Sequence, residues 1–140
     1  MGAAVDTNII IDVIAGSPAV AERAAAVLSG QGSRAGLVIS PVVYAELHAH
    51  PGWGKVEIDG FLQSTAIAVD WSLKREVWES AGTAFSTYAH RRKRQGDGFS
   101  RRLLADFIIG AHAAGVGSLI TSDRDFYVTN FPGLRVIGLS

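Results

Sequence analysis

Four acidic residues of this chain occupy positions where a carboxylate could take part in chemistry. Asp6 ends a short apolar run at the start of the chain, and Asp123 follows a second such run at 117–121. Glu46 and Asp106 each interrupt a segment that is otherwise apolar and has helical periodicity. Buried carboxylates are costly unless they are paired or bound to a cation. Because the ligands would all be oxygens, the hard divalent cations Mg²⁺ and Mn²⁺ suit such a cluster better than zinc.

Each of these carboxylates also has an ordinary structural explanation. Asp6 could cap the helix that follows it by accepting backbone N–H bonds. Glu46 could be a solvated residue on a helix whose other face is apolar, and Asp106 could pair with Arg102, four residues earlier. Asp12, four residues after the Asn at position 8, is predicted to be a solvated helix residue and not a ligand.

The acidic residues can meet only if the fold brings several segments to one place. Short β-rich apolar runs alternate with longer segments of helical period, which predicts an α/β domain with a mainly parallel sheet. We expect strands at 2–6, 35–40, 66–70, 117–121 and 134–138. Since the carboxyl ends of parallel strands share one edge of a sheet, Asp6 and Asp123 should lie on the same edge. They would be neighbours if the first and fourth strands pair.

The connecting segments have clear helical signals. Helices are expected at 7–15, 18–28, 41–50, 55–63, from 72 to about 94, and at 101–114, with 95–100 as a loop. Ser17-Pro18 and Ser40-Pro41 each combine an N-cap residue with a proline in the first helical turn.

Composition limits the possible functions. A chain of 140 residues is expected to form a single domain over 1–140. The absence of cysteine excludes a disulfide framework, a thiolate zinc site and a cysteine nucleophile. The N-terminus lacks the basic region of a signal peptide, and the most apolar stretch, 103–116, is shorter than the roughly 20 residues that span a bilayer. We therefore expect a cytoplasmic protein without a membrane partner.

Four segments resemble, in order and spacing, the motifs of PIN-domain ribonucleases. They are Asp6-Thr7-Asn8, Tyr44-Ala45-Glu46-Leu47, the helix segment Ala105–Ala113 and Thr121-Ser122-Asp123-Arg124-Asp125-Phe126. The near-minimal length resembles the stand-alone VapC toxins of prokaryotic type II toxin–antitoxin pairs, and the match covers essentially the whole chain. The resemblance implies a three-layer α/β/α sandwich around a five-stranded sheet of order 3-2-1-4-5.

The resemblance also implies roles for individual residues. Asp6, Glu46, Asp106 and Asp123 match the acidic metal-binding and catalytic quartet of the family, and the supporting polar positions are Asn8 and Thr121. The implied activity is Mg²⁺-dependent or Mn²⁺-dependent hydrolysis of RNA, with water as the nucleophile. Such cleavage leaves a 5′-phosphate and a 3′-hydroxyl.

Partners are implied in the same way. A VapC-like protein would be a homodimer, neutralised by a cognate VapB-like antitoxin that docks a C-terminal segment near the active site. Trp53, Trp71 and Trp78 are expected in the core or in packing between subunits.

A neutral chain, with 13 basic and 13 acidic residues, can attract nucleic acid only through local clustering. The basic cluster consists of Arg91, Arg92, Lys93, Arg94, Arg101 and Arg102, opposed only by Asp97. We predict that it follows the RNA backbone. The same run is also consistent with a solvated helix end, favoured by the helix macrodipole, or with a surface for an acidic partner.

Three other kinds of protein share parts of this pattern. A phosphatase with an aspartyl nucleophile needs a second Asp two residues after the first, where this chain has Asn8. A receiver domain needs a phosphoacceptor after the third strand, and Asp70 fits poorly because Trp71 follows it and no acidic pair ends the first strand. A catalytically silent PIN-fold binding module would not need four mutually repelling carboxylates. The silent module and a metal-dependent phosphatase remain the alternatives to a ribonuclease.

Overall fold

The computed structural model describes residues 2–94 and 103–139, and its centre is one parallel β-sheet. Its strands are β1 (Ala3–Val5), β2 (Leu37–Ile39), β3 (Ile67–Val69), β4 (Ser118–Ile120) and β5 (Arg135–Ile137). They lie in the order β3-β2-β1-β4-β5, and all neighbouring pairs are parallel. Each strand falls inside its expected range, so the five expected strands and their order are confirmed.

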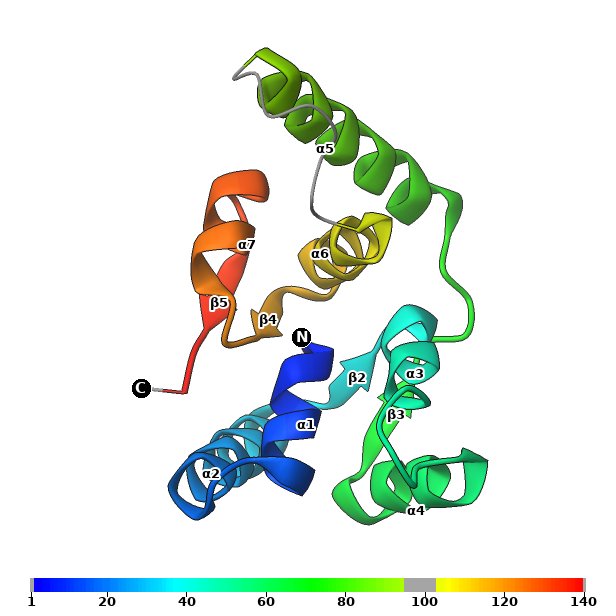
Figure 1. The fold of residues 1–140 in the computed structure, drawn as a ribbon, viewed down its shortest axis with the longest axis vertical. Coiled ribbons are helices and arrows are strands. Elements are labelled where there is room, and N and C mark those ends of the chain that lie inside the picture. The colour runs from blue at the N-terminus through cyan, green and yellow to red at the C-terminus, as the bar shows by residue number, and fades with distance from the viewer. Residues whose placement is uncertain (1, 95–102, 140) are drawn as a thin grey trace.

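Helices cover both faces of this sheet. In the described part of the chain they are α1 (Thr7–Ala15), α2 (Pro18–Arg34), α3 (Pro41–Leu47), α4 (Lys55–Thr65), α5 (Arg75–Arg94), α6 (Leu104–Val116) and α7 (Arg124–Asn130). In Figure 1, α5, α6 and α7 lie above the strands, and α1, α2 and α4 lie below them. The chain adds β2 and β3 on one side of β1, and then β4 and β5 on the other side. Because parallel crossovers are right-handed, the helices of these two halves cover opposite faces of the sheet. The result is the expected three-layer α/β/α sandwich.

Two helix starts follow directly from the local sequence. The Ser17 hydroxyl accepts a hydrogen bond from the Val20 backbone N–H at 3.4 Å, and Ser40 accepts one from the Val42 N–H at 3.1 Å. A proline follows each serine, where the missing N–H removes no intrahelical bond. Both predicted N-caps are confirmed.

Helix ends differ more from the expectation. Instead of ending at 28, α2 continues to Arg34, with the Ala35 N–H still bonded to the Gln31 carbonyl. The two glycines in this last part lower helix propensity by about 1 kcal/mol each, but no proline stops the backbone ladder. In contrast, α3 ends at Leu47 and not at 50, because the next three N–H groups bond to carbonyls three residues back. The expected loop at 95–100 and helix start at 101–102 lie outside the described residues.

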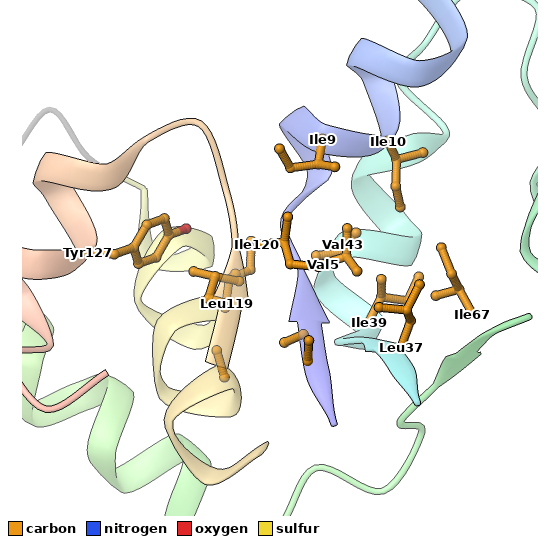
Figure 2. Close-up of a cluster of buried hydrophobic side chains, with 14 of the residues drawn as sticks. Val5, Ile9, Ile10, Leu37, Ile39, Val43, Ile67, Leu119, Ile120 and Tyr127 are labelled. Carbon is orange, nitrogen blue, oxygen red and sulfur yellow. The ribbon is translucent and has the colours of Figure 1, made fainter. Parts of the chain in front are cut away.

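The core lies on both faces of the central strands. Val5 in β1, Ile39 in β2, and Leu119 and Ile120 in β4 are fully buried, and Figure 2 shows them between the helices. A sheet covered on both sides needs such continuous apolar strands. The tryptophans differ from a simple core assignment, since Trp71 is 65% exposed and Trp78 is 50% exposed. No helix among the described residues has the length and apolar character to cross a membrane.

One glycine in α6 is required by packing. A Cβ added at Gly110 would lie 2.3 Å from the ring of Phe131, which also packs against Phe107 and Tyr127. We expect Gly110→Ala to lower the free energy of unfolding by about 1–3 kcal/mol, because the buried ring must shift. Gly115→Ala, in the same helix with open space around it, is the matched control and should be neutral or stabilising. Urea unfolding distinguishes the two, and equal stabilities would contradict this packing account.

Candidate metal and active site

Asp6 lies at the junction of β1 and α1, at the carboxyl edge of the sheet. Its side chain is 5% exposed, and one carboxylate oxygen accepts the Thr7 backbone N–H at 2.7 Å. The other oxygen accepts hydrogen bonds from the Thr121 hydroxyl at 2.8 Å and the Asn8 amide at 3.2 Å. Asp6 is therefore the N-cap of α1, as its ordinary explanation predicts. It is also fixed by the two residues expected to support it.

Thr121 and Asn8 connect Asp6 to the segment that carries Asp123. Parallel pairing of β1 with β4 brings these segments together, with Val5 opposite Ile120. The Thr121 hydroxyl accepts the Asp123 backbone N–H at 3.0 Å, and the Asn8 side-chain oxygen accepts the Ser122 N–H at 3.2 Å. These bonds fix the β4–α7 turn against the start of α1. Asp123 begins α7, but its side chain does not cap the helix.

Glu46 and Asp106 approach the same place from two helices. The Thr7 hydroxyl donates a 2.6 Å hydrogen bond to Glu46 in α3, which links α3 to the start of α1. Glu46 is half-buried, so its description as merely a solvated helix residue is wrong. Asp106 lies in the first turn of α6 and is also half-buried. The alternative pairing of Asp106 with Arg102 involves a residue outside the described part of the chain.

The four carboxylates line one pocket of about 370 Å³. Its walls are Asp6, Thr7, Asn8, Ile11, Asp12, Glu46, Asp106 and Asp123. Within residues 2–94 and 103–139, no lysine or arginine lines this pocket. Asp12 was predicted to be only a solvated helix residue, yet it faces the same hollow one turn after Asn8. The i,i+4 spacing, which places side chains on one helix face, was the signal that could have revealed it.

Burial and negative charge raise the pKa values of two groups at this site. Burial raises the pKa of Asp6 most, the hydrogen bonds from Thr121 and Thr7 oppose this, and the charges of Asp106 and Glu46 add to it. The net effect is a rise of this pKa from 3.8 to about 6. Burial, together with the negative charge of Asp6, Asp106 and Asp123, also raises the pKa of the Tyr127 hydroxyl. A bound cation would relieve both effects.

The residues present fit a hard divalent cation by their chemistry. The donor set is all oxygen, it carries several negative charges, and the buried Tyr127 hydroxyl beside it has no hydrogen-bond partner in the described structure. As the side chains lie here, however, no three acidic or histidine groups among the described residues are grouped closely enough to hold a metal ion. Glu46 is instead held by Thr7. The pocket thus supplies suitable ligands without a preformed coordination shell.

The basic cluster divides into engaged and exposed residues. Arg91 donates to the Asn130 side chain at 3.0 Å and lies over the ring of Tyr88, and the Nε of Arg92 is buried. Lys93 and Arg94 are exposed at the end of α5. Arg101 and Arg102 lie outside the described residues. Lys93 and Arg94 are thus the described members of the cluster most open to a ligand.

Comparison with known proteins agrees with this fold. The PIN domain family matches residues 3–132, so the chain belongs to the PIN domain family. The structure is similar to a toxin–antitoxin complex from Klebsiella pneumoniae, with a TM-score of 0.67, 19% identity and coverage of 99% of this chain and 98% of that one. A search of curated protein sequences gives no significant match.

Two further solved structures share the fold. VapBC2 from Rickettsia felis, bound to a promoter DNA fragment, has a TM-score of 0.66 and 20% identity over 99% of this chain and 98% of that chain. VapBC-1 from nontypeable Haemophilus influenzae has a TM-score of 0.65 and 21% identity over the same shares of the two chains.

Proposed function

We propose that the protein is a divalent-metal-dependent ribonuclease. The observation that carries the proposal is the pocket at the carboxyl edge of the sheet, where Asp6, Glu46, Asp106 and Asp123 meet from four different elements. Open α/β sheets bind their ligands at this edge. A scaffold without catalytic or metal-binding function would gain nothing from a buried carboxylate, Asp6, whose pKa is raised by burial and by two neighbouring carboxylates.

The proposed roles follow from how each residue is held. The four carboxylates hold Mg²⁺ or Mn²⁺, while Asn8 and Thr121 keep Asp6 in place through their hydrogen bonds. The cation, when bound, lowers the pKa of water and offsets the charge of the phosphodiester. The pocket is open to solvent through half-buried Glu46, Asp106 and Asp123, so a phosphate can reach them from outside. The nucleophile is water and not the ribose hydroxyl.

Purified protein and a 5′-labelled pool of small RNAs test this function. We expect cleavage with Mg²⁺ or Mn²⁺ and none with EDTA. Every product should carry a 5′-phosphate and a 3′-hydroxyl, which ligation and phosphatase treatment report. Cyclic phosphate ends, or cleavage that persists in EDTA, would contradict the proposal. Release of phosphate from monoesters without RNA cleavage would favour a metal-dependent phosphatase instead.

We also propose that the protein is a VapC-like toxin, a homodimer neutralised by a VapB-like antitoxin. Support comes from the match of this fold to 98% of two VapBC chains. The exposed Trp71 and Trp78 add to it, because they are large apolar side chains on the surface. Expression in a bacterial host should arrest growth, and the catalytically disabled Asp106→Asn chain should not. Equal growth inhibition by the two chains would contradict a toxin that acts through this site.

The exposed basic residues of α5 should contribute to RNA binding. Replacing both Lys93 and Arg94 by Gln should reduce the slope of log affinity against log salt by about 1.4, since each phosphate neutralised on single-stranded RNA contributes about 0.7. Gln at Lys74, just before α5, and at Arg75, its first residue, removes the same charge and should leave the slope unchanged. Filter binding at several salt concentrations measures both. A slope that does not distinguish the two pairs would rule out this RNA contact.

A further inference from the structure

Tyr127, in α7, is a buried tyrosine that neither the fold nor the proposed reaction explains. The residue is 0% exposed, and its hydroxyl makes no hydrogen bond within the described structure. Its ring packs against Phe126 and Phe131. Phenylalanine would make the same ring contacts without burying a polar atom, so the packing alone does not account for the hydroxyl.

The hydroxyl is directed towards the acidic pocket. Figure 2 shows the ring of Tyr127 beside β4, with its oxygen pointing towards Ile120, the last residue of that strand. This is the end of the sheet where β1 continues into Asp6. Of the carboxylates that act on the hydroxyl, Asp6 has the strongest effect and is the one within reach as an acceptor, followed by Asp106 and Asp123. Three carboxylates of the quartet therefore act on one buried donor that makes no hydrogen bond in the position described here.

Asp6 is the carboxylate that we expect to accept a hydrogen bond from the Tyr127 hydroxyl. Its two oxygens already accept bonds from Thr7, Thr121 and Asn8, all from β1–α1 or from the end of β4. Tyr127 belongs to α7, an element that supplies none of these donors. Groups that donate hydrogen bonds to a metal-binding carboxylate orient it. Their loss typically weakens metal binding by about 10–100-fold.

We propose that Tyr127 is a positioning residue, whose hydroxyl donates a hydrogen bond to Asp6 when the pocket holds its divalent cation. This inference rests on the proposed metal-dependent function. The hydroxyl has no hydrogen-bond partner among the described atoms, and Asp6 is the first of the charged groups that act on it. A bond that forms together with cation binding stabilises the metal-bound state, so it acts on metal affinity and not on the stability of the protein without metal.

Calorimetric titration of Mn²⁺ at pH 7 into wild-type and Tyr127→Phe protein tests the proposal. The phenylalanine variant should bind Mn²⁺ about 10–100-fold more weakly. Without metal, its urea midpoint should equal or exceed that of the wild type, because only an unpartnered hydroxyl is removed. Tyr88→Phe makes the same chemical change in α5, where the ring packs on Phe107, and should keep wild-type affinity.

The outcomes separate this inference from the proposed function. Equal Mn²⁺ affinity of the wild type and Tyr127→Phe would overturn the positioning role and leave the metal site standing. A Tyr127→Phe variant that is destabilised without metal but unchanged in affinity would also overturn it, since the hydroxyl would then be structural. No Mn²⁺ binding by the folded wild type would overturn the metal-dependent function itself, and the positioning role with it.

Discussion

The Asp106→Asn protein should lose at least about 100-fold in RNA cleavage while folding as the wild type does. Asp106 lies in the first turn of α6 and lines the pocket with the other three carboxylates. Asparagine has almost the same shape, so packing in α6 is kept, but it removes a negative charge and an anionic ligand. Cleavage of labelled RNA measures the loss, and circular dichroism and urea unfolding verify the fold.

Asp125→Asn is the matched control for this change. Asp125 is an exposed acid in the first turn of α7, two residues after Asp123, and it does not line the pocket. The control removes the same charge close to the site and should keep its cleavage rate within about twofold, as expected of a surface change. A fully active, metal-dependent Asp106→Asn protein would remove Asp106 from the catalytic site.

The second large effect is on stability. Without divalent metal, Asp6→Asn should raise the free energy of unfolding at pH 7 by up to about 3 kcal/mol, because about two pKa units of unfavourable ionisation disappear. Asparagine can still cap α1 by accepting the Thr7 N–H. The value is an upper bound because Asn8 and Thr121 also donate to Asp6, and an amide accepts fewer bonds.

The pH dependence gives the sign of this effect. The pKa of Asp6 is about 6 in the folded protein and 3.8 in the reference state, so the native state binds more protons over that interval. Stability contributed by protonated Asp6 is therefore present below about pH 4 and is lost as the pH rises through about 6. Urea unfolding of the metal-free protein between pH 4 and 7 should show this decline in the wild type but not in Asp6→Asn. Parallel curves would contradict the assignment of the raised pKa to Asp6.

Much of the fold could be predicted because its signals are local. Apolar runs with turn residues at both ends located the strands, and Ser17-Pro18 and Ser40-Pro41 located two helix starts. Helix ends were less predictable. The helix α2 continues past two glycines because its backbone hydrogen bonds continue, and no single residue type signals this. Trp71 and Trp78 are largely exposed, although their large apolar side chains favour burial. Their exposure depends on how distant segments pack, which the local sequence does not specify.

The site could be predicted in part for a related reason. Asp6 and Asp123 follow strands, so parallel pairing alone places them together. Glu46 and Asp106 were anomalous because a charge interrupted an apolar helix face. The sequence did not predict that Asp12 and Tyr127 lie near the four carboxylates. Their place depends on the turn of α1 and on the packing of α7, and both arise only when distant segments meet.

The central claim is that the four carboxylates form one divalent-metal site. Anomalous diffraction from crystals soaked in Mn²⁺ tests it most directly, because the signal gives the position of the ion itself. We predict a peak in the pocket within coordination distance of Asp6 and at least two of Glu46, Asp106 and Asp123. The absence of such a peak at saturating Mn²⁺, or ions bound only outside the pocket, would contradict the account.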